Sequence, residues 1–384
     1  MILLLQRPLD PATRDQLVAC LRREGLDGQL SVSGLERGAR TIEVELSRPD
    51  PDLAARATLW PGVMQVIAKE SVTPLASAAA GAVRVTPVRP ASPEITIGPE
   101  HFVWVAGPCA VEDPETLARA ARVVRATGGV LLRAGAYKPR TSPYSFQGLG
   151  RDGLVTLAHV AGDHGLAIVT EVLDPRDVEF VATHAEILQL GARSMQNFPL
   201  LREAGASGRP ILLKRGPAAT LDEWIGAAEY CLESGATGVI LCERGVRGFD
   251  PDRRNVLDLA VVPAVRARCK LPVFVDPSHA TGKRALVRPM AKAAVVAGAD
   301  GVMVEIHPRP EHSRSDAAQA LFVDELAPLV RDLEVLAAFE NRVVVSAQPF
   351  VSPPPSASCD AIQPVDPRLA RGGGFRSARR TPTR

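Results

Sequence analysis

The chain has 384 residues and a formal net charge of +2 at pH 7, so charge favours neither nucleic acid nor a membrane surface as a partner. Aromatic residues make up only 4% of the sequence, no run of about 20 apolar residues occurs, and the opening MILLLQRPLD lacks the basic start of a signal peptide. The six cysteines are widely scattered, which favours reduced thiols and a cytoplasmic location.

Residues 1–75 alternate short apolar runs with amphipathic segments. The pattern predicts strand, helix, strand, strand, helix, strand, which is the order of a small ferredoxin-like α+β domain. Residues 76–98, rich in Ala, Pro and Val, are interpreted as a linker. The expected strands are 1–5, 30–34, 41–46 and 63–68, and the expected helices are 10–25 and 50–60.

Residues 99–338 carry eight short apolar runs separated by helix-length segments. Strands that are almost continuously apolar and are each followed by a helix indicate a parallel sheet. Eight such units in about 240 residues fit a (β/α)8 TIM barrel. A doubly wound sheet is the alternative, but no G-x-G-x-x-G follows the first strand. The runs are FVWVAG, GVLLRAG, LAIVTEV, EILQLGA, ILLKRG, GVILCERG, PVFVDPS and GVMVEIHP.

Residues 339–384 are dominated by Pro, Ser, Gly and Arg and show no periodicity. This composition predicts a disordered basic tail. Such a tail either remains solvated or binds a polyanion, and the sequence favours the first interpretation.

Polar or reactive side chains follow every one of the eight runs. Active sites of TIM barrels lie at the carboxyl ends of the strands, so these side chains are expected to face one site. Six cations in one cavity would repel each other unless anions join them, whereas any one of them alone could be an ordinary surface residue. Arginine and lysine suit carboxylate and phosphate, which predicts multiply anionic, phosphorylated substrates. The six cations are Arg133, Lys138, Arg140, Arg193, Lys214 and Arg244.

A second group at the strand ends combines a thiol, an imidazole and two carboxylates: Cys109, His279, Glu305 and Asp316. Alone, Cys109 would be a small buried hydrophobe and His279 a core histidine. Together, at neighbouring strand ends, they form a mixed ligand set that suits Mn, Fe, Co or Zn. His307 and Asp276 are expected beside these ligands.

Seven sequence motifs of residues 99–338 resemble those of a known family. The motifs AGPCAVE, RAGAYKPRTSPYSFQG, LGARSMQN, LLKRG, LCERGVRGF, VDPSHATG and VEIHPRP are similar to those of the metal-dependent 3-deoxy-D-arabino-heptulosonate 7-phosphate (DAHP) synthases of the short-barrel type I beta subfamily. The resemblance covers about residues 95–335. The N-terminal region resembles the ferredoxin-like regulatory domain that some members carry.

The resemblance implies the first step of the shikimate pathway, in which phosphoenolpyruvate and erythrose 4-phosphate form DAHP and phosphate. It assigns the carboxylate side of phosphoenolpyruvate to Arg133 and Lys138, and makes Glu171 the residue that faces this substrate and positions water. The phosphate of phosphoenolpyruvate falls to Arg193, Lys214 and Arg244.

For the second substrate, the resemblance assigns the phosphate of erythrose 4-phosphate to Arg140 and Thr141. It implies one divalent metal per subunit, with Mn favoured, on the four ligands named above. It further implies an aromatic amino acid as effector and a homo-oligomer, with a tetramer favoured. An active enzyme that also binds a chorismate mutase as a partner is compatible with it.

Two departures and two rivals accompany this resemblance. Position 134 is Ala where the family more often has Gly, and SRSDAAQAL lacks the Gly-Pro pair usual after the aspartate.

The 3-deoxy-D-manno-octulosonate 8-phosphate synthases share the chemistry but carry an Ala-Asn-Arg-Ser pattern where this chain has KPRTS. A catalytically inactive barrel that serves as a scaffold is the second rival, and the complete set of cations and ligands argues against it.

Overall fold

The computed structural model describes residues 2–6, 9–26, 41–44, 52–67, 73–140 and 142–347. The strand expected at 30–34, position 141 and the tail from residue 348 onward lie outside the described residues. Among the described helices, none is both long enough and apolar enough to cross a membrane.

The described residues of the N-terminal region form a three-stranded antiparallel sheet in the order β2-β1-β3, with two helices. Asp10 starts the first helix, because its carboxylate accepts a hydrogen bond from the Thr13 N–H at 2.9 Å and Pro11 occupies the first turn. Leu3, Leu17 and other apolar side chains form a core of this region's own. The elements are β1 (Ile2–Leu5), α1 (Pro11–Arg23), β2 (Thr41–Glu43), α3 (Leu53–Ala57) and β3 (Val63–Ile67).

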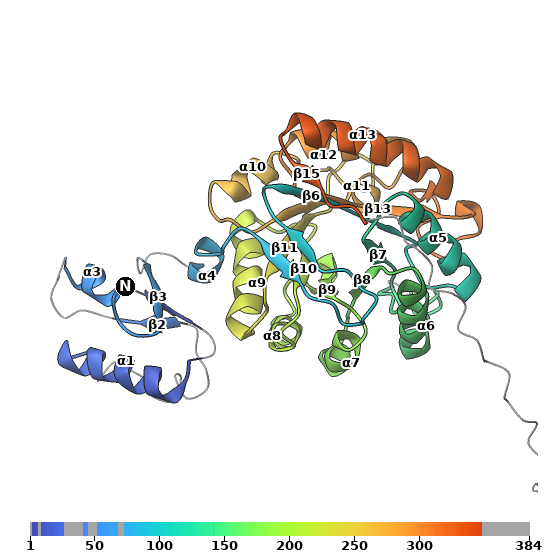
Figure 1. The fold of residues 1–384 in the computed structure, drawn as a ribbon. Coiled ribbons are helices and arrows are strands. Elements are labelled where there is room, and N and C mark those ends of the chain that lie inside the picture. Colours follow the sequence, from blue (N-terminus) through green and yellow to red (C-terminus); the bar gives the residue numbers. More distant parts are fainter. Residues whose placement is uncertain are drawn as a thin grey trace, which may run out of the picture. The chain divides into compact units, whose positions relative to one another are not determined.

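Eight parallel strands of the described chain close into a barrel (Figure 1). The last strand pairs with the first, from Gly301 opposite Val103 to Glu305 opposite Gly107. This closure confirms the predicted TIM barrel and excludes the doubly wound sheet. The strands are β6 (His101–Gly107), β7 (Leu131–Arg133), β8 (Ala167–Glu171), β9 (Ile187–Leu190), β10 (Ile211–Lys214), β11 (Val239–Glu243), β12 (Val273–Val275) and β13 (Gly301–His307).

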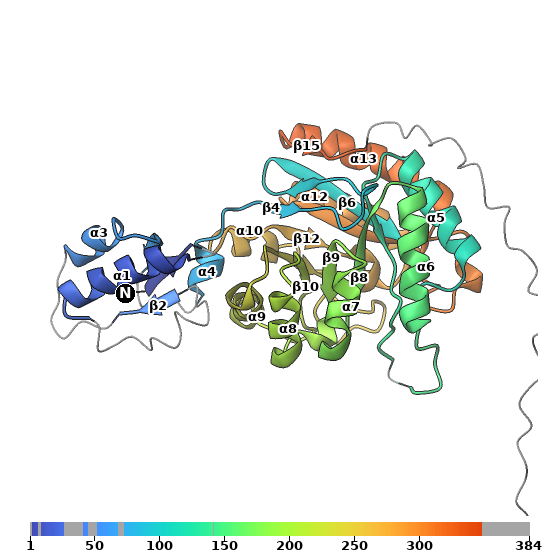
Figure 2. The ribbon, with the colours of Figure 1, turned by 60° about the horizontal axis from the view of Figure 1, so that its bottom comes forward.

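Helices surround these strands (Figure 2) and bury their apolar faces against them. Side-chain caps set several helix starts; for example, Thr220 and Glu223 form a reciprocal capping box. The helices are α4 (Pro74–Ser77), α5 (Pro114–Ala126), α6 (Gly150–Asp163), α7 (Val178–Ala182), α8 (Phe198–Ala206), α9 (Leu221–Ser234), α10 (Val261–Arg266), α11 (Pro277–Thr281), α12 (Arg284–Val296) and α13 (Leu326–Phe339), with short β14 (Leu321–Phe322) and β15 (Val343–Val344).

The segment expected to be a linker carries an antiparallel hairpin, β4 (Val83–Val85) and β5 (Ile95–Ile97). Its buried Val and Ile side chains pack against inward-facing residues of the barrel strands. The strand runs VRV and ITI are short and lie among prolines, so the sequence pattern did not reveal them.

A buried ion pair fastens this segment to the barrel. The carboxylate of Glu186, which is fully buried, accepts hydrogen bonds from the Arg89 guanidinium at 3.0 Å and from the Val88 and Ile168 N–H groups at 3.1 and 2.7 Å. The hairpin is therefore part of the barrel's core, and the opposite end of the barrel is left for chemistry.

Candidate active site

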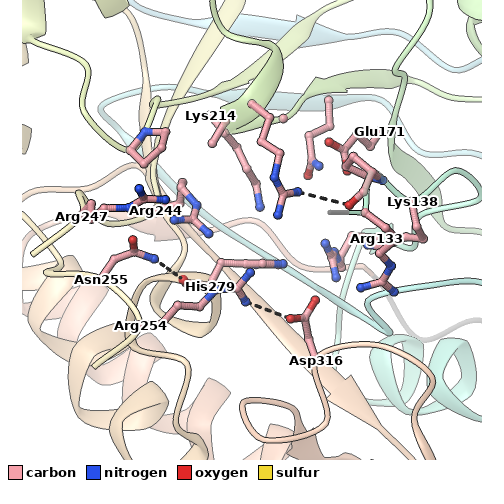
Figure 3. Close-up of a pocket in the computed structure, with 17 residues that line it drawn as sticks. Arg133, Lys138, Glu171, Lys214, Arg244, Arg247, Arg254, Asn255, His279 and Asp316 are labelled. Carbon is pink, nitrogen blue, oxygen red and sulfur yellow. Dashed lines mark hydrogen bonds and ion pairs between the residues drawn. The ribbon is translucent and has the colours of Figure 1, made fainter. Parts of the chain in front are cut away.

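A cavity of about 240 Å³ opens at the carboxyl ends of the barrel strands (Figure 3). Strand ends supply its walls: Arg133 ends β7, Glu171 ends β8, and Lys214 ends β10. Two acids and one histidine face a much larger number of cations there. All six cations predicted from the sequence line it, and two further ones, Arg247 and Arg254, join them.

The four candidate metal ligands converge beside this cavity. One ligand atom from each of Cys109, His279, Glu305 and Asp316 lies within 4.8 Å of the others. The Cys109 Sγ is 2.9 Å from Asp316 Oδ2, and His279 Nε2 is 3.1 Å from Glu305 Oε1. A soft sulfur, one imidazole nitrogen and two carboxylate oxygens form a donor set that suits a divalent transition metal.

Asp276 orients the imidazole of His279. It begins α11, and its Oδ1 accepts from the His279 N–H at 2.9 Å. Its Oδ2 contacts His279 Nδ1 at 2.7 Å and accepts from Lys214 Nζ at 2.5 Å. Nδ1 is therefore occupied, and Nε2 faces the other candidate ligands.

The same arrangement sets the charge of this histidine. Burial alone would lower its pKa, but the carboxylates of Asp276 and Glu305 raise the pKa of His279 to about 10. Burial raises the pKa of Glu305, yet His279 and Arg133 outweigh it and hold that pKa well below its usual value. A cation that binds at Nε2 must therefore displace a proton.

Three of the candidate ligands, the thiol and the two carboxylates, each have a cation of the cavity as a partner. Lys138 Nζ lies 3.0 Å from Cys109 Sγ, and Arg133 Nη1 donates to Glu305 Oε1 at 2.7 Å. Arg254 Nη1 donates to Asp316 Oδ1 at 2.9 Å. The candidate metal ligands and the cations of the cavity are therefore in direct contact, so a change of charge in one group affects the other.

The loop 136–148 builds one rim of the cavity. Arg140 Nε donates to the Phe146 carbonyl at 3.0 Å, and Lys138 N donates to the Gln147 carbonyl at 2.9 Å. The buried Nη2 of Arg140 has no hydrogen-bond partner among the described residues, so it is available to an anion. Of the two residues expected to bind the second phosphate, Arg140 lines the cavity, and Thr141 lies outside the described residues.

Asp316 adopts a left-handed backbone conformation, with φ of 57°. Its loop lacks the Gly-Pro pair of the family, but the Arg284 N–H anchors the next turn by donating to the Ala318 carbonyl at 3.0 Å. His307 faces Glu112, with Nε2 at 3.5 Å from the carboxylate, rather than the four ligands.

Sequence reasoning missed Arg247 and Arg254 because, in the segment after β11, it assigned a role only to the first residue, Arg244. Both belong to the loop after β11, which folds back so that Val246 and Val256 pair and Asn255 N donates to the Ala280 carbonyl at 2.9 Å. The sequence gives one indication of their role, which is that both lie in the loop whose first residue is Arg244.

Gly191→Ala is expected to reduce turnover without unfolding the protein. A Cβ at this position would lie 1.9 Å from the Oε1 of Glu171, so the carboxylate must shift from its position in the cavity lining. Because only the end of a flexible side chain is displaced, the melting temperature should change little while kcat falls roughly tenfold or more. Steady-state kinetics and thermal melts measure the two effects, and an unchanged kcat would show that the position of Glu171 is unimportant.

Comparison with known proteins gives a consistent result. Residues 77–338 match the model of the DAHP synthetase I family. Phospho-2-dehydro-3-deoxyheptonate aldolase of Thermotoga maritima is 48% identical over 244 residues, which cover 64% of this chain and 72% of that protein. A crystal structure of phospho-2-dehydro-3-deoxyheptonate aldolase (DAHP synthase) from Thermotoga maritima aligns with a TM-score of 0.67 and 37% identity, covering 89% of this chain and 98% of that one.

A relative with a different name is more distant. The 2-dehydro-3-deoxyphosphooctonate aldolase of Nitratidesulfovibrio vulgaris is 30% identical over 256 residues, which cover 62% of this chain and 92% of that protein. The difference in identity favours the seven-carbon product over the eight-carbon one.

Proposed function

The chain belongs to the DAHP synthetase I family, and on this premise we propose how its cavity divides the reaction among its residues. It condenses phosphoenolpyruvate and erythrose 4-phosphate with water to give DAHP and phosphate, the first step of the shikimate pathway. The observation that carries the assignment of roles is a single cavity that joins eight cations to a four-residue cluster of metal-binding type.

Phosphoenolpyruvate binds five of the cavity's cations, of which four are buried and Arg193 is exposed. Arg133 and Lys138, both almost fully buried, hold its carboxylate side. Arg193, Lys214 and Arg244 hold its phosphate. Guanidinium and ammonium groups placed in advance around a trianionic substrate bind it without a large ordering cost, and this supports the assignment.

Erythrose 4-phosphate binds nearer the rim. Arg140, with a buried and unpaired Nη2, takes its phosphate together with Thr141. Pro139 fixes the short backbone between Lys138 and Arg140. The two anions are thereby held at separate positions, with the reacting carbons between them.

Cys109, His279, Glu305 and Asp316 hold one divalent metal ion per subunit, for which we favour Mn. When bound, the metal supplies Lewis-acid polarisation of the aldehyde of erythrose 4-phosphate. Asp276 keeps the His279 ring in the orientation that this role needs, through the 2.7 Å contact to Nδ1.

The remaining chemistry falls to the cations and to Glu171. The C2=C3 π electrons of phosphoenolpyruvate form the bond from C3 to the aldehyde carbon, and the C=O π electrons move to the aldehyde oxygen. Water then adds to C2, where positive charge develops, and the proton it loses balances the one that the aldehyde oxygen gains. Glu171 lines the cavity and accepts a hydrogen bond from that water. Phosphate leaves C2, and Lys214 and Arg244 stabilise the charge that it carries away.

We further propose a homotetramer in the cytoplasm, with an aromatic amino acid as effector and a chorismate mutase as a partner. The separate N-terminal α+β region supports a regulatory role. The five described cysteines are free, which fits a reducing compartment.

The substrate assignment is tested by phosphate release from phosphoenolpyruvate with each of two aldoses. Erythrose 4-phosphate should support turnover, because the KPRTS loop presents Arg140 to a four-carbon sugar phosphate. Faster turnover of arabinose 5-phosphate would instead assign the chain to the octulosonate synthases.

Arg140→Ala is expected to raise the KM for erythrose 4-phosphate by about 10- to 100-fold, because one charge-assisted contact is worth roughly 1.5–3 kcal/mol. The KM for phosphoenolpyruvate should change much less. Arg151→Ala, which removes an exposed arginine paired with Asp177, is the matched control. The opposite pattern of KM values would exchange the roles of Arg140 and Lys138.

A further inference from the structure

Gln319 is a buried amide between a cation of the cavity and one of the proposed metal ligands. Its side chain is 2% exposed. Its Nε2 donates to Glu305 Oε2 at 2.6 Å, and its Oε1 accepts from Arg254 Nη1 at 3.1 Å. The same Nη1 of Arg254 donates to Asp316 Oδ1 at 2.9 Å, a contact visible in Figure 3.

The chemistry of the two neighbours fixes the orientation of this amide. A guanidinium can only donate, so Gln319 must turn its oxygen toward Arg254. The carboxylate of Glu305 forms an ion pair with Arg133, 2.7 Å from Nη1 to Oε1, and a carboxylate in such a pair can only accept. The amide nitrogen therefore faces Glu305, and both polar ends of Gln319 are satisfied.

This contact distinguishes the two oxygens of Glu305. Oε1 faces Arg133 Nη1 at 2.7 Å and His279 Nε2 at 3.1 Å, on the side of the cluster. Oε2 is engaged by Gln319. A carboxylate can bind a cation through one oxygen or through two, and here only Oε1 is presented.

The loop that carries Arg254 is tied to the other ligands as well. Arg254 N donates to the Thr281 carbonyl at 3.2 Å, and Asn255 Nδ2 donates to the His279 carbonyl at 3.3 Å. Arg254 also holds Asp316, a non-glycine residue in the left-handed region, which is costly without support. Arg254 and Gln319 thus contact two of the four proposed ligands, Asp316 and Glu305, and the neighbouring Asn255 contacts a third, His279.

We propose that Gln319 and Arg254 are positioning residues of the metal site, which restrict Glu305 to coordination through Oε1 and hold Asp316 in place. This inference rests on the proposed metal assignment and adds residues outside the ligand set. An apolar residue of equal size at position 319 would fill the same space, but it would leave Oε2 of Glu305 free to turn toward the cation.

Gln319→Met tests this proposal, because it keeps the volume and removes the amide. Apo-enzyme is titrated with Mn²⁺ against a competing chelator, and the Kd should rise about 10- to 100-fold. The absorption spectrum of the Co²⁺-loaded variant should also change, since a second oxygen from Glu305 raises the coordination number. Gln147→Met is the matched control, because Gln147 Nε2 donates only to carbonyls of its own loop.

A second variant tests the proposal if Gln319→Met does not fold. Arg254→Met removes the other end of the chain of contacts at a residue whose side chain is 36% exposed, so the fold should tolerate it. It too should weaken Mn²⁺ binding and alter the Co²⁺ spectrum. Wild-type Kd and spectrum in both variants would overturn the positioning role alone, whereas a wild-type enzyme that binds no metal would overturn the metal assignment with it.

Discussion

Complete removal of divalent metal is expected to lower DAHP formation by roughly a thousandfold or more, because Lewis-acid catalysis supplies several kcal/mol. Cys109, His279, Glu305 and Asp316 place their ligand atoms within 4.8 Å of one another, and the cavity offers no other cluster of this kind among the described residues. Activity should return on addition of Mn²⁺ to the chelated enzyme. The measurement is phosphate release before chelation, after it and after add-back.

The control for this result is His279→Ala, which removes a ligand and should not be rescued by Mn²⁺ at concentrations that restore the chelated wild type. The variant also frees Asp276 from one of its two cationic partners, so its melting temperature must be measured alongside. Full activity after verified metal removal would show that the four residues serve a purpose other than metal binding.

The barrel and its ligand cluster could be predicted because their signals are local. Each strand is a short apolar run that ends in a polar residue, and parallel strands bring those ends to one face. Residues at a strand end therefore line the cavity as expected, such as Lys214, the last residue of β10, and Arg244, the first residue after β11.

Arg254 and Gln319 could not be predicted in this way, since their positions depend on how long loops fold back over the barrel. Arg254 lies ten residues after Arg244, and its contact to Asp316 joins positions 62 residues apart. Neither spacing nor residue type indicates that pairing. The hairpin of β4 and β5 was not predicted from the sequence either, because strands of three residues show little periodicity.

The pairing of ligands with cations links metal binding to substrate binding. In the structure, Lys138 and Arg133 contact Cys109 and Glu305, yet the same cations are proposed to hold phosphoenolpyruvate. A metal ion that neutralises the two ligands leaves these cations to the substrate. Bound metal should therefore raise the affinity for phosphoenolpyruvate. By thermodynamic linkage, bound phosphoenolpyruvate should raise the affinity for the metal by the same factor.

Lys138→Met is accordingly expected to lower kcat/KM for phosphoenolpyruvate by about 10³-fold, since truncating one partner of a buried charge pair in a binding interface costs roughly 2–5 kcal/mol. Its Nζ is buried and lies 3.0 Å from both the sulfur and the carbonyl oxygen of Cys109. Burial opposes the charge, but Cys109 and Glu171 outweigh it and raise the pKa of Lys138, so the ammonium persists at neutral pH.

Two further measurements separate this role from a general loss of structure. Lys292→Met removes an exposed lysine of α12 that lies 3.7 Å from Asp332, and it should leave kcat/KM unchanged. In Lys138→Met itself, phosphoenolpyruvate should no longer tighten Mn²⁺ binding as it does in the wild type, because the cation shared by ligand and substrate is gone. If that tightening persisted at full size, Lys138 would serve only one of the two partners, and the coupling would have to pass through Arg133.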